Sequence, residues 1–395
     1  MRALFALDPS YVATNHGSFG APPKAVIEAK LRKSLEIEFN PDVFVKVNQD
    51  QWLDESLLPA ATLLGLKTVK DCVFSVNATT AINAVLRSLK ALKILCFSSV
   101  YGNVKNGINY ICDNDGFGRV TLDIPVPISD EDFVRRVRNV IDSQRALGNE
   151  IVLAIYDIIS SVPGVICPYQ QLTDLFRSHD ILTCVDAAHA VGQIPVDLGQ
   201  LKPDFFVTNL HKWLFVPRGC ALFYVAPLFQ KIVRHPVISE EKPGDWRRGF
   251  HWIGTIDHSA YLTTKAAIDF RKWIGGEEAI RDYCHRLAVR GGHIVADILG
   301  TSVMKGIGAG EPTFGDGYFA AMVNVRVPDT PIVREGGDSF IGGLQVKMLK
   351  QYNAAVAPYK YDGEYWMRLS AQVYLNDNDF HKLGNMLREV FFDGK

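Results

Sequence analysis

The sequence lacks paired cysteines and any long apolar run. Its seven cysteines are odd in number and scattered, and none forms a C-x-x-C pair. Disulfide frameworks and structural zinc sites need such pairs, so we expect no metal site and reduced cysteines in a cytoplasmic protein. No stretch reaches 18 apolar residues, and the start "MRALFALDPS" is broken by Asp8 and Pro9. We therefore expect neither a membrane span nor a signal peptide.

An excess of charge of either sign is also missing. Lysine and arginine number 42 against 43 aspartates and glutamates, with no basic block and no acidic tail. Nucleic acids and anionic membranes attract clustered positive charge, so neither is expected as a partner. No internal repeat or low-complexity segment is present, which argues against solenoid and disordered classes.

What is present is the composition of a globular protein large enough for two domains. The chain has 395 residues, of which 48% are apolar and 22% charged. Between roughly residues 50 and 235, short apolar strands alternate with helices, which indicates an α/β fold whose mostly parallel sheet is covered on both faces. The expected strands are Val73 to Val76, "ILCFSS", "IVLAIYDI", "ILTCVDAAHA", "FFVTN" and "CALFYV". Before them, "KAVIEAKLRKSLEIEF" predicts a helix with Ile27, Leu31, Leu35 and Phe39 along one stripe.

The character of the sequence changes after this region. Residues 237–255 are polar, aromatic and glycine-rich and are expected to form a loop. Helices are predicted over 259–275 and 277–299, followed by strands and helices of a smaller α+β domain. We expect an N-terminal segment (1–20), a large domain (21–255) and a small C-terminal domain (256–395).

Ligands of open parallel sheets lie at the carboxyl ends of the strands, so the residues there are the first candidates. The stretch "NATTAIN" follows the first strand and opens a helix, whose free N–H groups and hydroxyls suit a phosphate. An ordinary N-cap is the alternative for this stretch alone. Tyr101 follows the second strand and either lies flat on a planar ligand or packs as a rim aromatic.

Two further strand ends carry an acid and a lysine. Asp186 ends an apolar strand and His189 follows it, although an aspartate capping the next turn would read the same way. Lys212 lies at a turn between two apolar strands. A lysine in a dry setting has a lowered pKa and becomes a nucleophilic amine. A lysine, an acid and a helix N-terminus with threonines are together the parts that hold pyridoxal 5'-phosphate.

At this point the sequence resembles a known family. It is similar to the class V aminotransferase superfamily of fold-type-I pyridoxal-phosphate enzymes, and most to its isopenicillin N epimerase-like branch, which includes hercynylcysteine sulfoxide lyases. The resemblance implies a large domain with a mostly parallel sheet between helices and a smaller α+β C-terminal domain. The stretches that carry it are "NHGSFGAPP", "NATTAIN", "VDAAHAVGQIPVDL", "NLHKWLFVPRGCALFYV", "WIGTIDHSAYL" and "RLSAQVYLNDND".

The resemblance also implies roles for residues. Lys212 would form the Schiff base with the cofactor, Asp186 would partner the pyridine nitrogen, and His189 would approach the phenolic oxygen of the ring. Tyr101 would stack on the ring, and Arg368 would bind the substrate α-carboxylate. The remaining implied contacts are Ala78, Thr79, Thr80, Asn209 and His211 at the phosphate, Thr255 from the other subunit of a homodimer, and Asn15, His16 and Ser161 on the substrate side.

The sequence departs from cysteine desulfurases of this family in two places. No cysteine precedes Arg368 in "YNAAVAPYKYDGEYWMRLS", which argues against a persulfide-forming desulfurase. In "YDIISSVPGV", Ile158 replaces a histidine that epimerase-like members often have, and Ser161 stands where desulfurases have asparagine. The reaction that we expect is β-elimination from a cysteine-derived amino acid or its sulfoxide, releasing pyruvate and ammonia. The alternatives are an epimerase or racemase, an aminotransferase, and a catalytically silent α/β binding protein.

Overall fold

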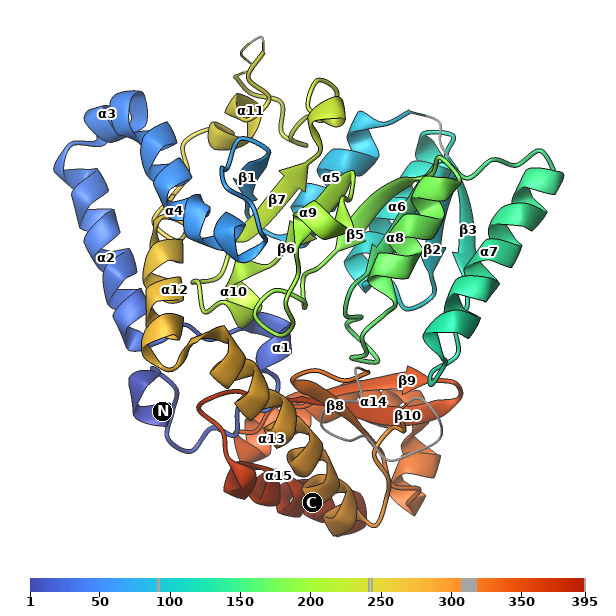
Figure 1. The fold of residues 1–395 in the computed structure, drawn as a ribbon. Coiled ribbons are helices and arrows are strands. Elements are labelled where there is room, and N and C mark those ends of the chain that lie inside the picture. The colour runs from blue at the N-terminus through green and yellow to red at the C-terminus, as the bar shows by residue number, and fades with distance from the viewer. Residues whose placement is uncertain (91–92, 241, 243, 307–317, 394–395) are drawn as a thin grey trace.

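A seven-stranded sheet forms the centre of the computed structural model, which describes residues 1–90, 93–240, 242, 244–306 and 318–393 (Figure 1). The strand order is β1-β7-β6-β5-β4-β2-β3, and β7 alone runs antiparallel to its neighbours. The mostly parallel sheet predicted from the alternating pattern is thus confirmed. The strands are β1 (Cys72–Ser75), β2 (Lys93–Phe97), β3 (Gly118–Leu122), β4 (Leu153–Asp157), β5 (Leu182–Asp186), β6 (Phe205–Thr208) and β7 (Ala221–Val225).

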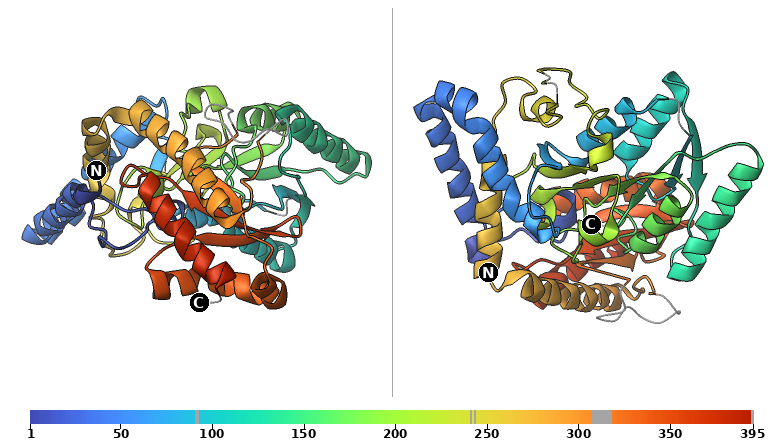
Figure 2. Two further views of the ribbon diagram at one scale, coloured as in Figure 1. Left: turned by 90° about the horizontal axis from the view of Figure 1, so that it is seen from below. Right: turned by 45° about the horizontal axis from the view of Figure 1, so that its top comes forward.

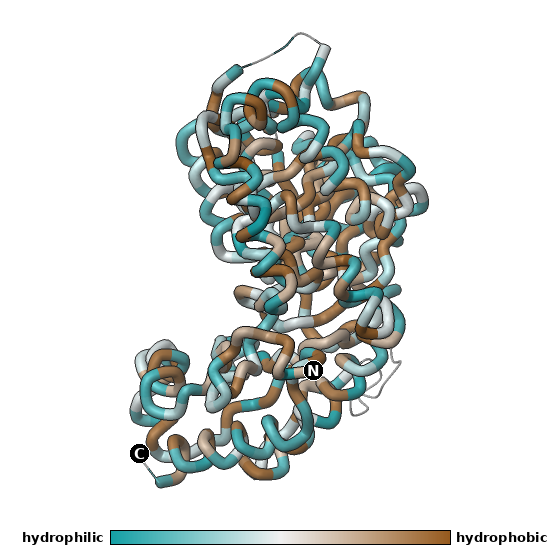
Figure 3. Tube along the Cα trace, turned by 90° about the vertical axis from the view of Figure 1, so that its left-hand side faces the viewer, coloured by the Kyte–Doolittle hydropathy of each residue, from teal (hydrophilic) through white to brown (hydrophobic). Residues whose placement is uncertain are grey.

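Helices cover both faces of this sheet, which explains why its central strands are apolar along their whole length. One face packs against α5 (Ala78–Ser88) and α6 (Gly102–Asn114). The other packs against α4 (Gln49–Leu63), α7 (Asp130–Ala146), α8 (Tyr169–Ser178) and α12 (Thr264–Trp273). In Figure 3 the apolar segments accordingly gather in the middle of the large part, between hydrophilic outer turns.

The short elements are η1 (Arg2–Leu4), α1 (His16–Phe19), α3 (Pro41–Val43), η2 (Phe44–Asn48), α9 (Leu198–Leu201), α10 (Leu210–Trp213), η3 (Pro227–Phe229), α11 (Arg248–His251) and η4 (Tyr261–Thr263).

A second, smaller sheet lies in the C-terminal part. Its antiparallel strands are β8 (Met322–Arg326), β9 (Ala357–Tyr361) and β10 (Glu364–Ser370), in the order β8-β10-β9. The helices α13 (Gly276–Leu299), α14 (Pro331–Tyr352) and α15 (Asp377–Phe392) pack around it, with α13 and α15 side by side (Figure 2). The predicted α+β character of this part is confirmed. The domain boundary at residue 255 stays a prediction, since α12 contacts α2 and α4 whereas α13 contacts β8.

Two local expectations differ from the structure. The segment 237–255 contains the short helix α11 rather than loop alone. The helix expected from residue 259 begins as a 3-10 turn, and its α-helical part starts at Thr264. The hydroxyls of Thr263 and Thr264 donate to the backbone carbonyls of Ala260 and Tyr261. Such local hydrogen bonds compete with a regular helix start.

The predicted helix before the first strand is present as α2 (Lys24–Phe39), but its apolar stripe does not face the core. Ile27, Leu31 and Leu35 are exposed, and Phe39 is 92% exposed. Val26 and Ala29, on another side of α2, are its buried residues, and α2 contacts α12. The apolar stripe of α2 therefore lies on the outer surface of the chain. Among the described helices, none is both long and apolar enough to cross a bilayer.

Candidate active site

The carboxyl ends of the strands bring the predicted lysine and histidine into contact. Asp186 is the last residue of β5, and His189 follows it in a turn. Lys212 lies in α10, directly after β6, which pairs with β5. The Nζ of Lys212 is 2.9 Å from Nε2 of His189. The two residues are 23 positions apart in sequence and meet only because neighbouring parallel strands end at the same edge.

The neighbouring tryptophan decides which ring nitrogen of His189 carries the proton. The indole Nε1–H of Trp213 donates to Nδ1 of His189 at 3.3 Å. An indole nitrogen can only donate, so Nδ1 must accept and the proton of the neutral ring is on Nε2. Nε2–H then donates to Nζ of Lys212, which has a free lone pair only as an uncharged amine. The arrangement therefore suits the nucleophilic form of Lys212.

The environment of Lys212 favours the same form. Burial, and then the charge of Arg368, lower the pKa of Lys212 to about 8, while Asp186 and Asp157 act in the opposite direction. Burial, followed by the charge of Lys212, lowers the pKa of His189 well below its usual range, so this ring stays neutral. A desolvated amine with a lowered pKa is what addition to a carbonyl requires.

Asp186 is the acid of the site. Its side chain is 3% exposed, and its Oδ1 accepts a hydrogen bond from the amide of Ala188 at 2.9 Å. Burial raises the pKa of Asp186, and the Ala188 amide and Lys212 oppose that shift. A buried carboxylate is costly without a cationic or donor partner, and a protonated ring nitrogen supplies one.

The N-terminus of α5 is organised by two asparagines. Asn77 caps the helix, and its Oδ1 accepts from the amide and the hydroxyl of Thr80. Asn209 Oδ1 accepts from the amide of Ala78 at 2.9 Å and so ties α5 to the loop that carries Lys212. The amide and hydroxyl of Thr79 stand at the positive end of the helix dipole, where they could donate to an anion.

Two aromatic side chains border this group. Tyr101 is the N-cap of α6, is 43% exposed, and has its ring centroid 6.0 Å from Nζ of Lys212. His211 holds its Nδ1 2.8 Å from the carbonyl of Cys220, which fixes the ring against the start of β7. Burial lowers the pKa of His211 to about 4, so the ring is neutral.

Arg368 contacts two predicted substrate-side residues, Asn15 and Ser161, and also Ser18. It lies on β10 and is 2% exposed. Its Nη2 donates to Asn15 Oδ1 at 2.9 Å and to Ser18 Oγ at 2.8 Å, and its Nη1 donates to the carbonyl of Ser161 at 2.9 Å. The Nε of Arg368 is buried without a partner among the described residues. Burial lowers the pKa of Arg368 to about 10, which leaves the guanidinium charged at neutral pH.

The ring of His16 lies between the lysine-bearing turn and the C-terminal part of the chain. Its Nε2 is 2.7 Å from the backbone carbonyl of Lys212 and its Nδ1 is 2.8 Å from the hydroxyl of Tyr374. Both ring nitrogens are thus used in holding α10 against the C-terminal part. Its role at the substrate stays a prediction, and its observed contacts are those of a residue that positions the lysine-bearing turn.

A buried arginine holds the same turn from the other side. Arg271 is 1% exposed, and its Nη1 donates to the carbonyl of Trp213 at 2.6 Å and its Nη2 to the carbonyl of Gly192 at 3.3 Å. Glu277 accepts from Nε and Nη2 of Arg271, both at 2.6 Å. The pair therefore joins the loops after β5 and β6 to the start of α13.

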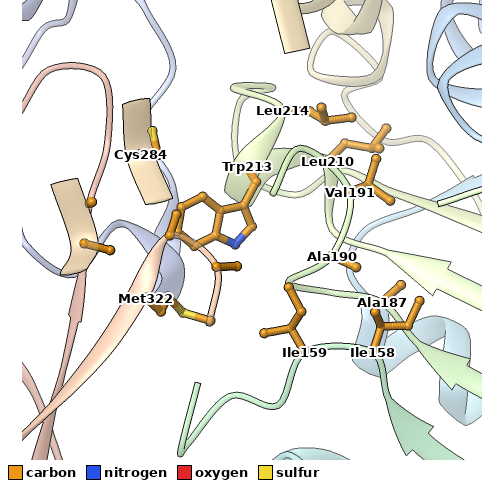
Figure 4. Packing of buried hydrophobic residues seen from close by; sticks show 14 of the residues in the cluster. Ile158, Ile159, Ala187, Ala190, Val191, Leu210, Trp213, Leu214, Cys284 and Met322 are labelled. Carbon is orange, nitrogen blue, oxygen red and sulfur yellow. The ribbon is translucent and has the colours of Figure 1, made fainter. Parts of the chain in front are cut away.

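Four of these residues escaped the sequence analysis: Ser18, Trp213, Arg271 and Asp157. Figure 4 shows Trp213 between Ile159 of the large part and Met322 of the small sheet, so its placement depends on segments far apart in the sequence. Asp157 carried a local signal, because it ends an apolar strand as Asp186 does. Thr255 lies exposed after α11, and its predicted contact with another subunit is outside what one chain tests.

Three observations indicate that the residues of this site suit pyridoxal 5'-phosphate. A buried amine with a lowered pKa lies within hydrogen-bonding distance of a histidine. A buried acid near it has no cationic partner in direct contact among the described residues, and a capped helix N-terminus follows β1 at the same edge of the sheet. These groups match the aldehyde, the ring nitrogen and the phosphate of that cofactor.

Comparison with known proteins shows the family and the fold of this chain. Residues 53–240 match the family model "Aminotransferase class-V". An L-cysteine desulfhydrase-like protein of Epichloe uncinata is 32% identical over 99% of this chain and 95% of its own length. The hercynylcysteine sulfoxide lyase of Schizosaccharomyces pombe is 28% identical over 98% and 96%. A mutant of C-DES with glycine covalently linked to the PLP cofactor has a similar fold, with a TM-score of 0.80 at 16% identity over 98% of both chains.

These similarities extend over nearly the whole chain rather than over the sheet alone. The predicted family and the predicted fold-type-I architecture are confirmed by them. The chain belongs to the class V aminotransferase family.

Proposed function

We propose that this chain is a pyridoxal-phosphate-dependent carbon–sulfur β-lyase acting on a cysteine-derived amino acid. The observation that carries the proposal is the 2.9 Å contact between Nε2 of His189 and Nζ of Lys212, beside the buried acid Asp186. Relatives over almost the full length are named as an L-cysteine desulfhydrase-like protein and a hercynylcysteine sulfoxide lyase.

The residues divide the work among binding, orientation and proton transfer. When bound, pyridoxal 5'-phosphate supplies an aldehyde for the amine and a ring that accepts electron density from Cα. Asp186 would hold the proton on the ring nitrogen, and Arg368 would fix the α-carboxylate so that one bond at Cα is aligned for cleavage. The Nζ of Lys212 would take the proton from Cα.

The overall reaction balances with one water. The Cα–H and Cβ–S bonds break, the sulfur leaves as a thiol, or as a sulfenic acid when the substrate is a sulfoxide, and water converts the remainder to pyruvate and ammonia. No second nucleophile of the protein is needed for this outcome.

A persulfide-forming desulfurase is disfavoured by the state of Cys284, the cysteine nearest upstream of Arg368 in the sequence. Cys284 lies in α13 and is 3% exposed, and its Sγ donates to Oε1 of Gln372 at 3.6 Å. Burial raises the pKa of Cys284 to about 12, so the thiolate is absent at neutral pH. Inert cysteine favours elimination over sulfur transfer to the protein.

Epimerisation and transamination would begin with the same removal of the Cα proton by Lys212. They are distinguished from β-elimination by the products that form. Purified protein reconstituted with the cofactor should be yellow and should release pyruvate and ammonia from S-substituted cysteines or their sulfoxides. Deuterium entering Cα from solvent with inversion, and without pyruvate, would instead support an epimerase. A colourless protein without cofactor binding would support the silent binding protein.

We also propose that the chain acts as a homodimer in the cytoplasm. The exposed row Ile27, Leu31, Leu35 and Phe39 on α2 supports a second copy as its partner, and Thr255 lies in an exposed loop. The seven free cysteines suit a reducing compartment. Light scattering gives the assembly state directly.

The shared site has a sharper test in mixed dimers. A Lys212→Ala chain mixed with a Thr255→Ala chain forms one site that has both native residues if Thr255 acts across the interface. Activity should then return in the mixture. If each site uses its own Thr255, the mixture should be no more active than the sum of the two variants.

A further inference from the structure

A second buried carboxyl lies beside Asp186 and has no role in the mechanism above. Asp157 is the last residue of β4, and in the register of the parallel pair β4–β5 it is the partner of Asp186. Asp157 is 4% exposed and Asp186 is 3% exposed. The two strands therefore end in two acids, side by side and away from water.

The two side chains lie on one face of the sheet. Side chains alternate along a strand, so Asp157 shares its face with Ile155, and Asp186 shares its face with Cys184. Ile155 and Cys184 belong to the core that packs under α5 and α6. The acids thus both face the helix whose N-terminus we assign to the phosphate.

One oxygen of Asp157 has no visible partner. Its Oδ2 is buried without a hydrogen bond among the described residues. An ionised carboxylate in this state would be strongly unfavourable, and a second one next to it more so. Two carboxyls that share a dry site hold one proton between them.

We propose that Asp157 is a positioning residue for Asp186: it keeps its own proton at neutral pH and donates it in a hydrogen bond to the Asp186 carboxylate. Asp186 is the better place for the negative charge, because the Ala188 amide already donates to it. The neutral acid stabilises that charge without adding another. Its importance for the cofactor rests on the proposed function of Asp186.

The groups that face Asp157 agree with this distribution. Burial, followed by the charge of Asp186, raises the pKa of Asp157 well above its usual range, while Lys212 opposes the shift. Cys167 is the other titratable group close to it, and burial raises the pKa of that thiol too, so it is neutral at pH 7. Lys212, in its protonated form, is thus the one side-chain cation that acts on Asp157 among the described residues.

Infrared spectra of the cofactor-free protein with isotope-labelled aspartate test the proton directly. We expect a carboxylic-acid C=O band at pH 7 that Asp157→Asn removes and Asp186→Asn leaves in place. The matched control is Asp204→Asn, because Asp204 is another acid with a raised pKa, bound to Thr183 away from the site. The Asp157 band should survive it. A band that survives Asp157→Asn, or no band at all, overturns the proposal.

Cofactor affinity tests the hydrogen bond to Asp186. The asparagine side chain is uncharged and can still donate, so Asp157→Asn should bind pyridoxal 5'-phosphate as the native protein does. Asp157→Ala cannot donate and should bind about tenfold more weakly. Equal loss in both variants, or no loss in either, overturns the proposal. If the native protein fails to bind the cofactor, the proposed function fails, and the infrared result still decides where the proton is.

Discussion

The indole nitrogen of Trp213 lies 3.3 Å from Nδ1 of His189, and this contact fixes the proton of the imidazole on the nitrogen that faces Lys212. The tryptophan therefore acts on the reactive amine through the histidine, although Lys212 precedes it directly in the sequence. The charge of Arg368 lowers the pKa of Lys212, and the Nε2–H of His189 gives the neutral form of the amine a hydrogen-bond donor.

Replacing Trp213 by phenylalanine tests this relationship. The variant lacks the indole N–H, so His189 can place its proton on Nδ1 and accept from an ammonium at Lys212. The pKa of Lys212 should rise above its native value of about 8. The pH dependence of its reaction with an amine-specific reagent measures this in the cofactor-free protein. Trp273→Phe, at a 69% exposed position, is the control, and an unchanged Lys212 profile in Trp213→Phe contradicts the assignment.

The burial of Lys212 should also appear in the pH dependence of stability. Its pKa is about 8 in the folded chain and 10.5 unfolded, so unfolding takes up a proton between these values. The free energy of unfolding of the native protein should therefore increase as pH rises from about 8 to 10.5, and this increase is lost again as pH falls to 8. Lys212→Met should be more stable than the native apoprotein at pH 7, by about 3 kcal/mol, with most of the difference gone near pH 10.5. Urea unfolding measures both, and a difference independent of pH would argue against a depressed pKa.

Arg271 should be essential for the lysine-bearing turn. Arg271→Met leaves Glu277 without its partner and removes the donors to the carbonyls of Trp213 and Gly192. Breaking a buried ion pair costs about 3 kcal/mol of unfolding free energy. The double variant Arg271→Met with Glu277→Gln should recover part of that loss. If the two losses simply add in a double-mutant cycle, the pair is not a unit.

Arg368 should act on substrates that carry an α-carboxylate and on no others. Arg368→Ala removes a charged donor, so KM for a cysteine conjugate should rise about tenfold or more. An amine that lacks the carboxylate should react with the cofactor-loaded variant and native protein alike, as followed by the absorption of the cofactor. A similar loss for both compounds would indicate that Arg368 supports the fold rather than the substrate.

The sequence was sufficient for the features that depend on local pattern. The strand-end rule selected Asp186 and Lys212, which lie at the carboxyl edge of the sheet, and the motif selected Arg368, which contacts Asn15 and Ser161. Their roles at the site stay predictions. The clamp by Arg271 depends on a contact across 58 residues, and the contact of His16 with Lys212 spans 196, so neither leaves a periodic signal. The period of the stripe on α2 predicted a helix, which is present, but a helical period does not tell a buried face from an exposed one.

Reduction of the reconstituted protein with borohydride, followed by peptide mass analysis, tests the central claim most directly. We predict that the cofactor is found on Lys212 alone and that Lys212→Ala leaves no peptide modified at comparable cofactor concentration. Modification spread over several lysines, or undiminished trapping in Lys212→Ala, would contradict the account.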